Sequence, residues 1–159
     1  MKQKQTSEIR KKAAAGIKAG DSFSVSRRFT KKDTESFGDI TRDYNPVHYD
    51  RRFAGAKQLS GPICHGLLVA GLITEIGGQI GWLASGMDFR FRKPVYFGDT
   101  VTCSFTVTAI NEQGKAKGEA IYINQNGVVV LEAVLTGIVP GSEEKRVLKA
   151  IMEEDCSAS

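Results

Sequence analysis

The chain has 159 residues, of which 41% are hydrophobic and 25% charged, and this composition excludes a disordered or fibrous protein. The formal net charge of +4 is mild, and the three widely spaced cysteines argue against a disulfide framework or a structural zinc site. No secretory signal is recognisable and no apolar segment is long enough to span a bilayer. We therefore expect one globular domain in the cytoplasm, with no membrane partner.

Residues 1–18 are predicted to form a basic N-terminal arm. Six basic side chains in this segment oppose a single acidic one, Glu8. A basic arm can contact nucleic acid, but this one has neither the aromatic motif of an RNA-binding module nor a DNA-reading helix pair. We favour an arm that is solvated or that packs on a partner subunit, and we expect no nucleic-acid partner. Within it, the stretch SEIRKKAAAGI is compatible with a helical turn.

The following segments predict a strand, a short helix and a bend. Apolar and polar residues alternate over 21–30, as in a half-buried strand. Thr30 with Asp33 three residues later fits a capping box, which predicts a helix that ends near Thr41. Asn45-Pro46 must then bend the chain, because the residue before a proline avoids helical geometry.

The second half of the chain predicts a buried helix and a sheet. Residues 64–81 are apolar nearly all round a helical wheel, which indicates a long helix buried on most sides. Four alternating segments follow, separated by the turn sequences NEQGK and NQNGV, and these predict an antiparallel meander. The charged tail, residues 141–159, is compatible with a terminal helix. The predicted fold is α+β: a single hot-dog-like domain over residues 19–140, with one long central helix wrapped by an antiparallel sheet.

The stretch RDYNPVHYD suggests acid/base chemistry. Asp43 and His48 are five residues apart, a spacing that would not place them on one face of a continuous helix. The bend at Asn45-Pro46 allows both side chains to converge on one water molecule, which a carboxylate and an imidazole together can deprotonate. The same stretch fits a polar turn equally well, with Asp43 and Asn45 as turn formers and His48 on the surface.

The stretch CHGLL opens the predicted central helix. The N–H groups at a helix start are unpaired, and Gly66 would let a carbonyl oxygen approach them, as in an oxyanion hole. Alternatively, Gly66 only relieves crowding, and His65 caps the helix or is hydrogen-bonded in the core. A nucleophile pair of Cys64 and His65 is disfavoured, because sequence neighbours seldom face each other.

A third stretch, RFRKPVYFGDTV, is basic. Arg90, Arg92 and Lys93 could attract phosphate groups, but a solvated strand face explains them as well, and we favour that interpretation.

Together, RDYNPVHYD, GPICHGLLVAGLIT and FRKPVYFGDTV resemble the MaoC-like (R)-specific enoyl-CoA hydratases. The resemblance runs from about Asp21 to Val139. The most specific motif of that family, D-x-N-P-[LIV]-H, is complete here. Arg42 departs from the small or acidic residue that often precedes the motif.

This resemblance implies a single hot-dog fold that forms a homodimer or higher homo-oligomer by joining sheets edge to edge. The implied reaction is the reversible syn addition of water to a trans-2-enoyl-CoA, giving the (R)-3-hydroxyacyl-CoA, with Asp43 and His48 as the catalytic pair. Gly66, Asn45 and Thr74 would form the oxyanion hole and substrate-binding set. An alternative for Thr74 is a hydroxyl bonded to its own helix. No metal and no cofactor are implied, since the acyl-CoA or acyl carrier protein arm is part of the substrate.

Three other functions compete with this one. A 3-hydroxyacyl carrier-protein dehydratase would use the same residues in the reverse direction, and its acidic carrier would favour a basic rim such as Arg51, Arg52 and Lys57. A hot-dog thioesterase would more typically use a carboxylate on the central helix, where Glu75 lies. A non-catalytic acyl-CoA-binding regulator would use the basic arm to contact DNA.

Overall fold

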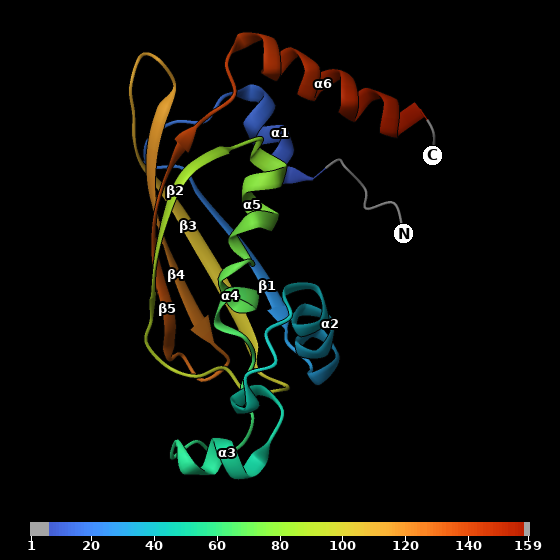
Figure 1. Ribbon diagram of the computed structural model, residues 1–159. Coiled ribbons are helices and arrows are strands. Elements are labelled where there is room, and N and C mark those ends of the chain that lie inside the picture. The colour runs from blue at the N-terminus through green and yellow to red at the C-terminus, as the bar shows by residue number, and fades with distance from the viewer. Residues whose placement is uncertain (1–6, 158–159) are drawn as a thin grey trace.

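The computed structural model describes residues 7–157, which form one antiparallel sheet and a set of helices that cover one of its faces (Figure 1). The strands run in the order β1-β3-β4-β5-β2, and every neighbouring pair is antiparallel. Their bounds are β1 Ser22–Arg28, β2 Leu83–Phe91, β3 Thr100–Ile110, β4 Lys115–Asn124 and β5 Val129–Ile138. The helical elements are α1 Glu8–Ala15, α2 Lys31–Thr41, the 3₁₀ turn η1 Pro46–His48, α3 Arg51–Ala56, α4 Gly66–Ala70, α5 Ile73–Ile80 and α6 Ser142–Ser157.

Buried and exposed residues alternate strictly along β4, which forms part of the inner face of the sheet. In β4, Ala116, Gly118, Ala120 and Tyr122 are buried, while the residues between them are exposed. Ala120 and Tyr122 belong to the same buried cluster as Ile76 and Ile80 of α5, which are fully buried. The observed architecture is the predicted α+β hot-dog fold.

The central helix occurs at the predicted place but is interrupted, so the expectation of one long helix needs correction. Around Gly71 the backbone hydrogen bonds join residues three apart instead of four. The Leu72 N–H donates to the Val69 carbonyl (3.1 Å), and the Thr74 N–H donates to the Gly71 carbonyl (2.9 Å). The Ala70 carbonyl instead accepts a 2.7 Å bond from the Tyr122 hydroxyl on β4. This interruption divides the layer into α4 and α5.

The first described helix packs on the core. Ala13 and Ala14 of α1 are buried, and Arg10 donates to the carbonyls of Gly78 (2.9 Å) and Gln79 (3.3 Å) near the end of α5. Basic groups near a helix C-terminus are stabilising, because they satisfy its last carbonyls. Part of the predicted N-terminal arm is therefore attached to α5, while residues 1–6 of it lie outside the described residues.

Helix α6 occurs where a terminal helix was compatible with the sequence, and residues 158–159 of that tail lie outside the described residues. The domain limits at residues 19 and 140 stay predictions. None of the helices within residues 7–157 has the length and apolar character required to cross a bilayer.

Candidate active site

The segment between α2 and η1 is a turn held by hydrogen bonds. Helix α2 begins with the predicted capping box of Thr30 and Asp33 and ends at Arg42, whose φ of 58° and ψ of 28° are left-handed. The Asn45 side chain then accepts from the Val47 N–H at 3.2 Å, and the Asn45 N–H donates to Asp43 Oδ1 at 3.2 Å. Asn45 thus fixes the turn, and the same turn orients the Asp43 carboxylate.

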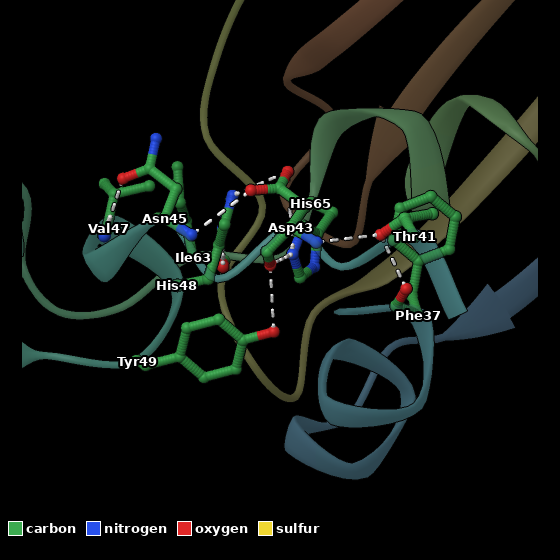
Figure 2. A network of polar contacts seen from close by, with 9 residues as sticks. All are labelled: Phe37, Thr41, Asp43, Asn45, Val47, His48, Tyr49, Ile63 and His65. Atoms are coloured by element: carbon green, nitrogen blue, oxygen red, sulfur yellow. Dashed lines mark hydrogen bonds and ion pairs between the residues drawn. The ribbon is translucent and has the colours of Figure 1, made fainter. Parts of the chain in front are cut away.

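Asp43 and His48 converge as the motif predicts (Figure 2). Nε2 of His48 lies 3.9 Å from Oδ2 of Asp43, which is close enough for one water molecule to bond to both. His48 is 8% exposed and is not the surface histidine of the alternative interpretation. The polar turn and the Asp43–His48 pair are therefore not alternatives, because the turn is what brings the two side chains together.

The tautomer of His48 follows from its other ring nitrogen. Nδ1 lies 2.8 Å from the Ile63 carbonyl, so Nδ1 carries the hydrogen and Nε2 presents its lone pair toward Asp43. Burial lowers the pKa of His48 from its ordinary 6.5, although the bond to Ile63 acts in the opposite direction. A neutral imidazole with a free Nε2 is ready to accept a proton.

The second histidine joins the same cluster. His65 is 1% exposed, and its Nε2 lies 2.9 Å from the Asp43 carbonyl oxygen and 3.8 Å from Asp43 Oδ2. Its ring stacks on that of His48, with centroids 3.8 Å apart and planes inclined by 29°. The sequence placed His65 beside Gly66 but gave no sign of this contact, which spans 22 residues of chain.

Asp43, His48 and His65 could in principle share a metal ion, because one donor atom from each lies within 4.8 Å of the others. An imidazole lone pair lies in the plane of its ring, however, so two stacked rings do not aim at a common point. Nε2 of His65 also already faces the Asp43 carbonyl. The geometry suits stacking better than ion binding, and the expectation of no metal and no cofactor stays a prediction.

Gly66 and His48 line one pocket of about 350 Å³. Gly66 is the first residue of α4, so its N–H has no acceptor within the helix. A Cβ at this position would lie 2.7 Å from the ring of Phe91, so the glycine also permits that close contact. Of the three basic residues Arg90, Arg92 and Lys93, the last two follow the end of β2 and line the same pocket, and Arg92 is paired with Glu132 at 2.7 Å.

Thr74 lies elsewhere. Its hydroxyl donates to the Gly71 carbonyl at 2.6 Å, which is the bond of the alternative interpretation, and it lines a second pocket of about 270 Å³ beside α5. Glu75, the carboxylate of the thioesterase alternative, is exposed on α5. Burial raises the pKa of the Cys64 thiol to about 11, which argues further against a cysteine nucleophile.

The chain is similar to known hydratases and dehydratases. A family model described as a MaoC like domain matches residues 12–128. An (R)-specific enoyl-CoA hydratase from Aeromonas caviae is 34% identical over 104 residues, which are 63% of this chain and 78% of that protein. A mitochondrial 3-hydroxyacyl-[acyl-carrier-protein] dehydratase from Arabidopsis thaliana is 27% identical over 133 residues, 78% of each protein. A solved (R)-hydratase structure from A. caviae matches with a TM-score of 0.73 and 29% identity, and the match covers 79% of this chain and 98% of that one.

The fold and these similarities define a hydro-lyase with a hot-dog architecture. The chain belongs to the MaoC-like dehydratase family.

Proposed function

We propose that the protein is an (R)-specific enoyl-CoA hydratase, which adds water reversibly to a trans-2-enoyl-CoA and gives the (R)-3-hydroxyacyl-CoA. The observation that carries this proposal is the distance of 3.9 Å between His48 Nε2 and Asp43 Oδ2. His48 also lines a pocket together with Gly66. We propose hydration as the direction of the reaction and CoA as the acyl carrier because a relative is named as an enoyl-CoA hydratase.

In the proposed reaction, a water molecule lies between His48 Nε2 and the Asp43 carboxylate. The pair takes one proton from this water as its oxygen forms a bond to C3 of the enoyl group. A proton from the same pair then bonds to C2 on the same face, so that water is added across the double bond and no charge is left over. The two groups share one water, so their protonation is a property of the pair.

The thioester oxygen gains negative charge while C3 is attacked. We assign the Gly66 N–H to this oxygen, because a backbone donor without an intrahelical partner is available in the pocket that contains His48. Arg92 and Lys93 on the wall of that pocket are suitable for the carrier end of the substrate. Asn45 contributes by holding the turn, and no metal or cofactor takes part in these steps.

A second pocket lies beside α5. The pocket there is lined by apolar groups and by Gly77 and Gly78, which leave space at the helix surface. A side chain at Gly78 would meet nothing within 4 Å, so packing does not require the glycine. We propose that this pocket receives the acyl chain and that Thr74 contacts the substrate there.

The test is hydration of crotonyl-CoA, followed by loss of enoyl absorbance and by chiral analysis of the product. Asp43→Asn and His48→Gln should each lower kcat by about two or more orders of magnitude, since each removes a positioned proton-transfer group. Asp39→Asn is the matched control, because Asp39 is an exposed carboxylate on α2 whose side chain contacts only Tyr44 among the described hydrogen bonds. Near wild-type hydration by either site variant would contradict the assignment.

Two further measurements separate the alternatives. Rapid release of free thiol without hydration would identify a thioesterase instead. Comparing crotonyl groups on CoA and on an acyl carrier protein distinguishes the hydratase from a carrier-protein dehydratase, and a series of acyl lengths measures the depth of the pocket beside α5.

A further inference from the structure

His65 lies between the catalytic turn and the core, and the proposed reaction does not use it. Its Nε2 is 2.9 Å from the carbonyl oxygen of Asp43. A carbonyl only accepts, so Nε2 carries the hydrogen and donates it. Nδ1 of the same ring is buried and has no hydrogen-bond partner among the described residues.

The two histidines are therefore held in opposite tautomers by two backbone carbonyls. His48 donates from Nδ1 to Ile63, whereas His65 donates from Nε2 to Asp43. Each bond fixes one ring, and the stack of 3.8 Å between centroids couples the two orientations. The ring of Phe37 lies on His65 at 5.2 Å, so its imidazole has contacts on more than one side.

The Asp43 carbonyl is the point at which the exposed turn is attached to the core. It accepts from the buried His65 and, at 3.3 Å, from the hydroxyl of Tyr49. Gly38 leaves the space for that hydroxyl, since a Cβ there would lie 1.8 Å from it. The Asp43 side chain is 48% exposed, so its position depends on how its own backbone is held.

We propose that His65 is a positioning residue for the reaction, acting through the Asp43 carbonyl and the face of the His48 ring. The donor at Nε2 sets where the Asp43 carboxylate stands relative to His48. The kinetic consequence rests on the proposed hydratase function, while the tautomer assignment stands on the structure alone.

Substitutions at His65 separate the donor from the ring. His65→Gln keeps an amide N–H at about the reach of Nε2, His65→Asn places its N–H too close to the backbone, and His65→Phe keeps the ring without a donor. We expect the Asn and Phe variants to lose about 10- to 100-fold in kcat, the cost of a small displacement of a catalytic group. KM should change less than about threefold, and Gln should keep kcat within about fivefold of wild type under the same reasoning.

Long-range ¹H–¹⁵N spectra of the imidazoles test the assignment without substrate. The chain has only two histidines, so both signals can be assigned by comparison with His65→Phe. At about pH 8, where a neutral histidine is expected, His48 should show the Nδ1–H pattern and His65 the Nε2–H pattern. In folded variants the His48 pattern should persist, since its bond to Ile63 is untouched.

Three outcomes would overturn the proposal. These are a wild-type spectrum with His65 as the Nδ1–H tautomer, a folded His65→Phe variant with wild-type kcat, and equal losses in the Gln and Phe variants while His48 keeps its pattern. If a variant fails to fold, the tautomer of His65 in the wild-type spectrum still tests the proposal. If wild type hydrates no enoyl-CoA, the proposed function fails, and the tautomers still decide the arrangement of the histidines.

Discussion

At the scale of single residues, His48 is prepared for its proposed role by its surroundings. The Ile63 carbonyl fixes its tautomer, and burial, aided by the neighbouring His65, lowers its pKa below 6.5. A base must be unprotonated at working pH to accept a proton from water. The Ile63 bond exposes the Nε2 lone pair but raises the pKa of His48, and burial outweighs that rise, so the net shift of the pKa favours a free Nε2.

The pH dependence follows from the sign of this shift. Because the pKa of His48 is lowered, the midpoint of the acidic limb of kcat/KM for crotonyl-CoA should lie below pH 6.5. The unfolded chain binds more protons than the folded one in that range, so the free energy of unfolding should also fall as the pH drops below 6.5. Rate profiles and urea titrations over the same buffers check both. An acidic limb with its midpoint above pH 6.5 would contradict the assignment of His48 as the base.

At the scale of elements, the sequence predicted the features that depend on residues close together in the chain. The turn was predictable because Asn45 bonds to Val47 and Asp43 within five residues of chain. The interruption at Gly71 was not, because the Ala70 carbonyl there bonds to the Tyr122 hydroxyl of a distant strand. His65 was missed as a partner of Asp43 for the same reason. Long-range contacts of this kind leave no periodic signal in one sequence.

Arg42, the departure from the family motif, now has a structural description. It occupies the C-cap of α2 in the left-handed region, at φ 58°. For a residue with a Cβ this conformation costs about 1–2 kcal/mol, which is why glycine is preferred at such helix ends. The arginine therefore stores strain immediately before the catalytic Asp43.

Replacing Arg42 with glycine should stabilise the protein. Removing the strain gains about 1–2 kcal/mol, and the greater freedom of glycine in the unfolded chain takes back about 0.4–1 kcal/mol. The difference of the central values is a net increase of about 0.8 kcal/mol in the free energy of unfolding, measured by urea denaturation. Arg42→Ala is the control, because alanine keeps the strain and should change stability by less than about 0.5 kcal/mol. A glycine variant less stable than the alanine variant would contradict this account.

At the scale of the whole molecule, the two edges of the sheet differ. Edge strand β1 presents Ser22, Ser24 and Ser26 on its exposed face, and these bond to hydroxyls of β3. Edge strand β2 instead exposes apolar side chains, with Leu83 at 69% and Phe91 at 56%. An exposed apolar edge favours pairing with another strand, whereas a polar edge discourages it. The edge at β2 is therefore the one suited to the homodimer expected from the family resemblance.

We expect β2 to pair with its copy in a second chain, and the double variant Leu83→Lys, Met87→Lys to be monomeric. Lysine side chains along an edge oppose strand pairing by charge and solvation. Sedimentation velocity should give twice the mass of one chain for wild type and for the matched control Ser24→Lys, Ser26→Lys on β1. Phe91 at the end of β2 lines the pocket that contains His48, so a partner strand would lie beside that pocket. A monomeric wild type would refute the pairing.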